Sequence, residues 1–249
     1  MAEAQDHPDS EHSVRPIGDG IFCLGQKKGG RVHAFLIEGK DGLTLIDTLY
    51  DTDGAFVAKV IKQMGRPISD LKNIVLTHAH RSHLGGLAAL KALSGAKVWA
   101  HEWESDIIAG ERKAQGVTVW PKRPLRVYHL QLGLALGFGA HPPCEVDAFL
   151  KDGDWIGPLQ VVYAPGHSPG HLAFYWKKCR TLFAGDSIAT WPYLDLGWAG
   201  LNLNKQHCLR SLLQLDDLDA DMIAVGHGEP ATGDQVARLR MMIRTARAD

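Results

Sequence analysis

Residues 78–83 read His-Ala-His-Arg-Ser-His, and they directly follow the short apolar run Ile74–Thr77. This run predicts a buried strand, so the histidines fall in the loop after a strand, where a rigid scaffold often places functional side chains. His78 and His80 are two residues apart and can turn to one side, while His83 can approach from the start of the next helix. The loop is therefore a candidate for a metal site, because imidazole is a common zinc ligand.

Three more loops follow predicted strands and carry the same kinds of side chain. They are Pro165–His171 (PGHSPGH) after Val161–Ala164, Gly226–Gly228 (GHG) after Met222–Val225, and Gly185-Asp186 after Leu182–Ala184. One loop histidine alone is unremarkable, but three histidine loops after three strands favour metal binding over chance. A catalytic zinc site uses imidazole and carboxylate ligands and keeps one position open for water.

Taken in order, these motifs resemble those of the metallo-β-lactamase superfamily over roughly residues 18–231. The matching residues are Asp47 at the end of an early strand, His78, His80, Ser82 and His83 in the HxHxDH position, His167, Asp186 and His227. The surrounding APGHSPGHLAFY and LFAGDS are most similar to the glyoxalase II-like branch. The resemblance implies an α+β fold, namely an αββα sandwich of two mixed sheets covered by helices, with a metal site at one edge.

The resemblance also implies a set of zinc ligands. His78, His80 and His167 would hold the first zinc ion, His83 and His227 would hold a second, and Asp186 would bridge the two. One or two zinc ions are expected, with iron as the other metal that such a site takes. Asp47, Arg81 and His171 are expected to lie beside these ligands and support them.

Ser82 stands where the superfamily motif carries an aspartate. A neutral hydroxyl is a much weaker ligand than a carboxylate, so we expect a tight first zinc and a weak second one. The expected catalytic groups are Ser82 and Asp186, around a metal that lowers the pKa of bound water to about 7 and so provides hydroxide to attack a carbonyl. Without the usual aspartate, the proton for the leaving group is expected from metal-bound water or from Asp186.

The leading functional hypothesis is a zinc-dependent hydrolase that cleaves an ester, a thioester or a lactone. A β-lactamase acting on antibiotics is the first alternative. Two alternatives come from other functional classes. One is an oxidoreductase that uses a single iron ion to oxidise a sulfur substrate, and the other is a non-catalytic metal-binding protein. Only 22 residues follow His227, so the helical extension that binds glutathione in glyoxalase II is not expected.

The composition is that of an ordinary globular protein, with 249 residues, of which 45% are hydrophobic and 22% charged. Lys and Arg (27) nearly balance Asp and Glu (28), which favours a small-molecule substrate over nucleic acid or a membrane surface as the partner. The polar N-terminus lacks the apolar segment of a signal peptide. We therefore expect a cytoplasmic protein, or a periplasmic one if this is the mature chain; the oligomeric state is left open.

A polar, disordered tail is predicted for residues 1–15 and a single domain for residues 16–249. Residues 101–145 lengthen the spacing between His83 and His167 and form a candidate lid. Aromatic residues in and near these loops are expected to pack, with a substrate wall as the alternative: Trp103, Trp120, Tyr128, Trp191, Tyr193 and Trp198. Apolar spacing predicts helices at Asp53–Met64, Leu84–Leu93, Trp103–Ala114, Lys205–Leu215 and Asp234–Ala248.

Overall fold

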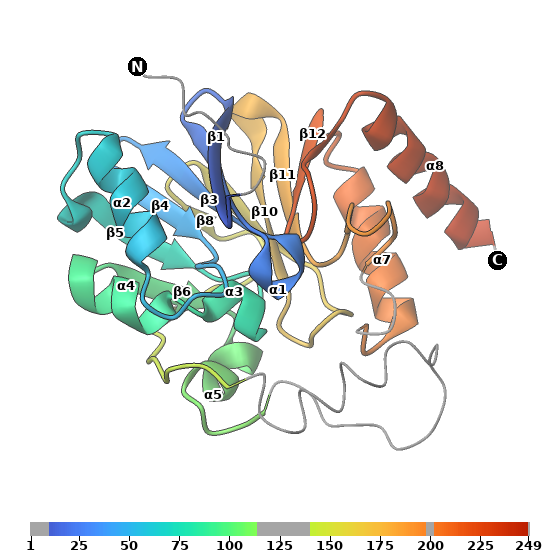
Figure 1. The fold of residues 1–249 in the computed structure, drawn as a ribbon. Helices are drawn as coiled ribbons and strands as arrows, with labels where there is room; N and C mark the ends of the chain where they lie inside the picture. The colour runs from blue at the N-terminus through green and yellow to red at the C-terminus, as the bar shows by residue number, and fades with distance from the viewer. Residues whose placement is uncertain (1–9, 114–139, 198–201, 249) are drawn as a thin grey trace.

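Two β-sheets lie face to face in the computed structural model, which describes residues 10–113, 140–197 and 202–248 (Figure 1). The first sheet contains β1 (His12–Gly18), β2 (Ile21–Gln26), β3 (Val32–Gly39), β4 (Gly42–Ile46), β5 (Leu71–Val75), β6 (Lys97–Ala100) and β7 (Ala148–Phe149), side by side in that order. The second contains β8 (Trp155–Ile156), β9 (Leu159–Tyr163), β10 (Leu172–Trp176), β11 (Thr181–Gly185), β12 (Met222–Val225) and β13 (Ala231–Thr232), in the order β13-β12-β11-β10-β9-β8.

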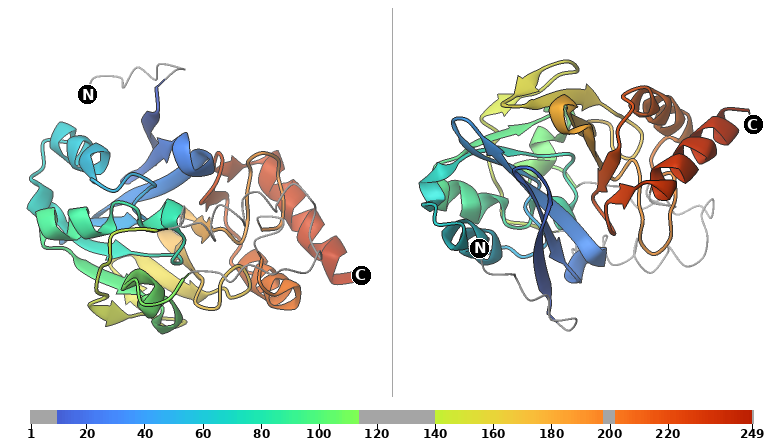
Figure 2. Two further views of the ribbon diagram at one scale, coloured as in Figure 1. Left: turned by 60° about the horizontal axis from the view of Figure 1, so that its bottom comes forward. Right: turned by 90° about the horizontal axis from the view of Figure 1, so that it is seen from above.

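Helices cover the outer face of each sheet. The longer ones are α2 (Ala55–Gln63), α4 (Leu87–Ser94), α7 (Lys205–Asp216) and α8 (Asp234–Ala248). Short helical turns are α1 (Lys28–Arg31), η1 (Ile68–Asp70), α3 (Arg81–Leu84), η2 (Glu102–Glu104), α5 (Ser105–Ile108) and η5 (Lys177–Cys179). Figure 2 shows α2 and α4 on one outer side and α7 and α8 on the other, which confirms the αββα sandwich. Within the described ranges, no helix is both long and apolar enough to span a bilayer.

Strand β3 shows how the layers are held together. Successive side chains of a strand point to opposite faces, and every side chain from Val32 to Ile37 is buried. Ala34 and Leu36 join the apolar cluster under α2 and α4, whereas Phe35 joins the cluster between the two sheets, where its ring lies 5.2 Å from that of Phe183 on β11. A strand buried on both faces reads as a continuous apolar run, which is what residues 34–37 provide.

The strand directions bring four functional loops to one edge of the sandwich. β4 and β5 are parallel neighbours in the first sheet, and β11 and β12 are parallel neighbours in the second. β9 is antiparallel to β10, which is antiparallel to β11, so β9 also runs in the direction of β11. The carboxyl ends of these strands therefore meet at the same edge, and the side chains that follow them can converge.

The N-terminal tail prediction was wrong from His12 onward. Residues 12–18 form β1, which pairs antiparallel with β2 and places His12 opposite Gln26. The His12 ring also stacks on Phe56 of α2 at 4.5 Å between centroids. These contacts join positions far apart in the sequence, so the polar composition of the tail did not reveal them. Residues 1–9 lie outside the described ranges.

The predicted helix at Trp103–Ala114 is replaced by the two short turns η2 and α5. Gly110 has a φ of 78°, a left-handed conformation that ends the helical path. Of the predicted lid, residues 114–139 lie outside the described residues, and so do Trp120, Tyr128 and Trp198. Trp103 and Tyr193 were expected to pack, but they are 61% and 47% exposed.

Candidate metal centre

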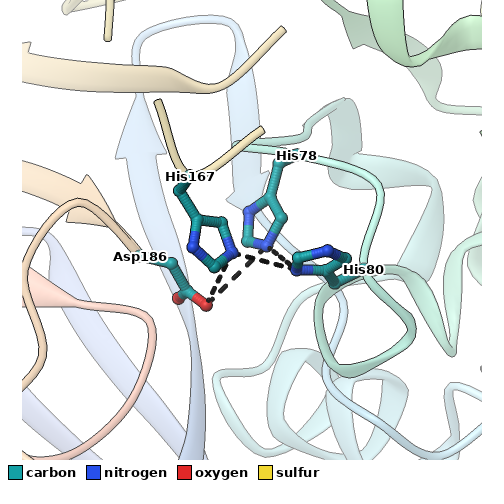
Figure 3. Close-up of side chains that lie close together, drawn as sticks. All are labelled: His78, His80, His167 and Asp186. Carbon is teal, nitrogen blue, oxygen red and sulfur yellow. Dashed lines mark hydrogen bonds and ion pairs between the residues drawn. The ribbon is translucent and has the colours of Figure 1, made fainter. Parts of the chain in front are cut away.

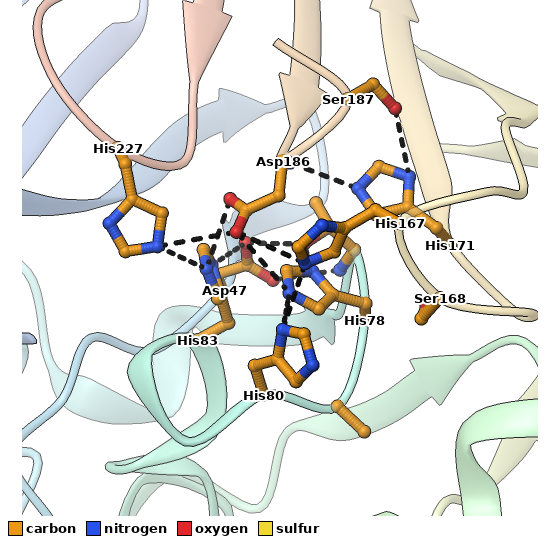
Figure 4. A network of polar contacts seen from close by, with 12 residues as sticks. Asp47, His78, His80, His83, His167, Ser168, His171, Asp186, Ser187 and His227 are labelled. Carbon is orange, nitrogen blue, oxygen red and sulfur yellow. Dashed lines mark hydrogen bonds and ion pairs between the residues drawn. The ribbon is translucent and has the colours of Figure 1, made fainter. Parts of the chain in front are cut away.

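Six side chains from four loops converge where the strands end. Four of them, His78, His80, His167 and Asp186, form the first donor group (Figure 3). Asp186 also belongs to a second donor group with His83 and His227 (Figure 4). In each group, one donor atom per residue lies within 4.8 Å of all the others. The structure thus brings together all six residues that the sequence motifs single out as ligands.

The spacing of the first donor group fits a small metal ion. Nδ1 of His80 lies 2.9 Å from Nε2 of His78 and 3.0 Å from Nε2 of His167. Oδ2 of Asp186 lies 3.7 Å from Nε2 of His78 and 3.4 Å from Nε2 of His167. Tetrahedral zinc with bonds of 2.0–2.1 Å separates its ligand atoms by about 3.3 Å, which falls within this spread.

The second donor group has the same spacing but fewer members. Nε2 of His83 lies 3.2 Å from Nε2 of His227 and 3.3 Å from Oδ1 of Asp186. Nε2 of His227 lies 3.4 Å from Oδ2 of Asp186. Oδ1 of Asp186 is buried and has no hydrogen-bond partner among the described residues, which is costly unless a cation lies nearby. The donor set therefore fits a second ion with Asp186 shared between the two groups.

Asp47 orients two of the histidines through their Nδ1 atoms. Its carboxylate accepts a hydrogen bond from Nδ1 of His83 at 2.9 Å and another from the Thr77 hydroxyl at 2.8 Å. The Thr77 oxygen in turn lies 3.0 Å from Nδ1 of His78, from which it accepts. Nδ1 of each ring donates to its oxygen partner, so Nε2 of His78 and of His83 is directed at the centre, and His83 coordinates a metal ion there once its Nε2 proton is released.

Two further acceptors orient the remaining rings, and no sequence motif indicates either of them. Oδ1 of Asn202 lies 3.2 Å from Nδ1 of His167, and the Gly30 carbonyl lies 2.8 Å from Nδ1 of His227. Gly30 has a φ of 91°, a conformation that favours glycine and turns this carbonyl toward the centre. Both rings are thus held in the tautomer that directs Nε2 at Asp186.

His171 supports the centre without joining either donor group. Its Nε2 accepts a hydrogen bond from the backbone N–H of Asp186 at 3.1 Å, and its Nδ1 lies 3.4 Å from the Ser187 hydroxyl (Figure 4). Close packing continues at Gly226, where a β-carbon would lie 2.2 Å from Oδ1 of Asp186. A side chain at position 226 would therefore displace the shared carboxylate.

Burial and the charges of neighbouring side chains set the pKa values of the histidines and of Asp186 in the two donor groups. Burial, with the neighbouring histidines, holds the pKa of His78 and His167 well below the ordinary value, and burial lowers the pKa of His80 to about 4. Burial also opposes charge on His83, but Asp186 and Asp47 outweigh it and raise its pKa to about 10. Burial disfavours the charged form of Asp186, yet His227 and His83 hold its pKa well below the usual range. At neutral pH the first donor group therefore offers free imidazole lone pairs.

Arg81 and Ser82 take no part in the hydrogen bonds of the donor groups. The Arg81 guanidinium lies 4.6 Å from the centre of the Tyr50 ring and donates to the carbonyl of Ala140. Ser82 is half-buried in the first turn of α3 and makes no hydrogen bond to the described residues. Arg81 was expected to support the ligands, but its contacts are directed away from them.

His33 of β3 is a buried histidine that belongs to neither donor group. The residue is 5% exposed, and its Nδ1 has no hydrogen-bond partner within the described part of the chain. Burial, assisted by His227 and Arg15, lowers its pKa to about 3. The folded protein therefore holds His33 neutral over a pH range in which an unfolded chain protonates it.

We expect His33→Leu to flatten the acid dependence of the free energy of unfolding of the metal-free protein. Between the folded pKa of about 3 and the unfolded value of 6.5, only the unfolded state binds this proton, so stability falls as the pH drops through that window. The contribution of His33 to the slope of the free energy of unfolding against pH is at most about 1.4 kcal/mol per pH unit, and the variant should lack it. Urea unfolding across the window measures it, with His207→Leu on the exposed face of α7 as control. An unchanged slope would contradict the expectation.

Comparisons with known proteins identify the family. The sequence model of the metallo-beta-lactamase superfamily matches residues 28–227. The probable metallo-hydrolase YqjP of Bacillus subtilis is 28% identical over 228 residues, which cover 83% of this chain and 70% of that protein. The human acyl-coenzyme A thioesterase MBLAC2 is 26% identical over 259 aligned positions, which cover 92% of this chain and 85% of that protein.

Solved structures share the same architecture. The metallo-beta-lactamase family protein TTHA1429 from Thermus thermophilus superposes with a TM-score of 0.67 at 26% identity, over 94% of this chain and 81% of that one. TTHA1623, solved in a di-iron-bound form, superposes with a TM-score of 0.65 at 27% identity, over 85% of this chain and 94% of that one. With the family model matched from the α1 turn to His227 and the sandwich matched in space, the chain belongs to the metallo-beta-lactamase superfamily.

Proposed function

We propose that this chain, a metallo-hydrolase of the superfamily, uses zinc to cleave the carbonyl group of an ester, a thioester or a lactone. The observation that carries the proposal is the pair of donor groups that share Asp186. A metal ion bound there supplies an activated water at neutral pH and polarises the carbonyl oxygen of the substrate. A small-molecule substrate is the partner that this chemistry requires.

The residues of the site have different roles in this reaction. His78, His80 and His167 would hold the first ion, and Asp47 with Thr77 keeps the Nε2 atom of His78 directed at it. His80 is the half-buried member of the first donor group, whereas the others are almost fully buried, so substrate approaches from the His80 side. His227 and His83 hold the pKa of Asp186 well below the usual range, so its carboxylate stays ionised and would hold the ions in place. The Ser82 hydroxyl has no hydrogen bond to the described residues and is available to contact the substrate or a water.

Thioesters are the first substrate class to test. MBLAC2 is named as an acyl-coenzyme A thioesterase, and its alignment covers most of both chains. The β-lactamase alternative requires attack on a ring amide, for which the same metal chemistry suffices. Zinc and iron are the metals to compare, because the TTHA1623 structure is a di-iron-bound form.

We expect the purified protein to lose its hydrolase activity on treatment with a chelator and to regain it with zinc. Protein reloaded with zinc or with ferrous iron is assayed on an acyl-coenzyme A, an aryl ester, a homoserine lactone and a chromogenic cephalosporin. Turnover of an ester, a thioester or a lactone by the zinc form supports the proposal. Turnover of the cephalosporin alone favours the lactamase, and silence on all four with zinc bound overturns a hydrolase of these classes.

A further inference from the structure

Glu104 is a buried carboxylate next to the metal centre that no sequence motif singles out. It ends η2, and the residue is 1% exposed. A buried charge is costly unless hydrogen bonds or a counter-ion compensate for it. The described part of the chain places no cation in ion-pair contact with Glu104, so its hydrogen bonds must stabilise it.

Three donors surround the Glu104 carboxylate, and all of them come from the loops that carry the first donor group. Oε2 accepts from the backbone N–H of Ala79 at 3.0 Å. Oε1 accepts from the Ser168 hydroxyl at 2.6 Å and from the backbone N–H of Gly170 at 2.8 Å. Ala79 lies between His78 and His80, and Ser168 follows His167. One carboxylate therefore ties together the two loops that supply all three histidines.

A second contact joins the turn that carries Glu104 to the loop of His167. The His101 ring stacks on Tyr163 with 4.7 Å between centroids and 14° between ring planes. The Tyr163 hydroxyl donates to the Pro169 carbonyl at 2.8 Å. The turn after β6 is thus fixed to the loop of His167 on both sides of Ser168. This turn reaches the centre because β6 runs parallel to β5, so both strands end at the same edge.

We propose that Glu104 is a positioning residue that sets the distance between His167 and the His78–His80 pair. The inference rests on the metal site of the proposed function. Only an ionised carboxylate accepts hydrogen bonds on both oxygens and donates none. Glutamine has the same size, but its NH2 group would face a donor, either Ala79 N–H on one side or Ser168 and Gly170 on the other. The loop spacing then changes although the packing volume is kept.

We expect Glu104→Gln to weaken zinc binding at the first donor group by about tenfold, as the loss of a supporting hydrogen bond does at other zinc sites. Zinc affinity is measured by competition with a chromogenic chelator, and the visible spectrum of the cobalt form reports ligand geometry. Glu102→Gln is the matched control, because Glu102 is an exposed carboxylate in the same turn. The control should bind zinc like the parent, with the same cobalt spectrum.

Thermal unfolding of the metal-free variants separates positioning from general stabilisation. A lower melting temperature for Glu104→Gln with unchanged zinc affinity would overturn the inference. If Glu104→Gln does not fold, Ser168→Ala removes one of the three donors and leaves two; we then expect a measurable loss of zinc affinity that is smaller than that of Glu104→Gln. Parental affinity in Ser168→Ala would overturn the inference in that case. If the parent protein binds no zinc, the proposed metal site itself is wrong. If the parent binds zinc and the Glu104→Gln variant binds it equally tightly, the metal site stands and only the role of Glu104 is wrong.

Discussion

Asp186→Asn is expected to remove metal from both donor groups and to lower kcat/KM by at least about 10³-fold. The substitution keeps the side-chain volume but replaces one carboxylate oxygen by an NH2 group, which does not coordinate a metal ion. Both oxygens of Asp186 are in use, since Oδ1 lies 3.3 Å from His83 and Oδ2 lies 3.4 Å from His167 and from His227. Metal chemistry supplies several kcal/mol of transition-state stabilisation, and each 1.4 kcal/mol is a tenfold change in rate.

Metal content and activity are measured on the same preparation of Asp186→Asn. Asp41→Asn is the control, because Asp41 is an exposed carboxylate in the turn between β3 and β4. Circular dichroism shows whether the variant is folded. A folded Asp186→Asn protein with two metal ions and parental activity would exclude Asp186 as the shared ligand. If Asp41→Asn also loses activity, the loss in Asp186→Asn comes from removing a negative charge anywhere on the protein and not from removing a metal ligand.

Local patterns in the sequence predicted the strand ends that carry the candidate donors, and the resemblance to the superfamily supplied the two-sheet sandwich. Strand β12 has the predicted bounds, Met222–Val225, and helix α8 has the predicted bounds, Asp234–Ala248. Each donor follows an apolar strand, and the strand ends converge because parallel neighbours in a sheet share an edge. Residue type and position after a predicted strand were therefore sufficient to single out His78, His167 and His227 as candidate ligands.

The groups that hold the donors in place could not be predicted in the same way. The acceptor for His227 is the Gly30 carbonyl, 197 positions away, and a backbone carbonyl leaves no mark in residue type. Asn202 and Glu104 are separated from their partners by 35 and up to 66 positions. Glu104 lies shortly after β6, but only the structure shows that β6 is parallel to β5 and so ends at the same edge. Such contacts depend on which distant segments pack together in the folded protein, and local sequence patterns do not reveal this.

Ser82→Asp is expected to strengthen binding of the second metal ion by more than about 100-fold. The second donor group has two imidazoles and only a share of Asp186, whereas the superfamily motif places an aspartate at position 82. A carboxylate there would add an anionic ligand directly, so its effect should exceed the 10–100-fold that supporting groups contribute. Ser82 is half-buried and makes no hydrogen bond to the described residues, so its replacement sacrifices none of their contacts.

The second-site expectation is tested by dialysis of parent and variant against limiting zinc, followed by metal analysis. We expect about one ion per chain in the parent and two in Ser82→Asp, because the His83 and His227 rings are already held by Asp47 and Gly30 and need only a further anion. Ser82→Asn supplies a side chain of equal size without charge and should behave like the parent. Equal metal content in parent and Ser82→Asp would show that the serine does not weaken the site, and the affinity of His83, His227 and Asp186 alone would then account for the second ion.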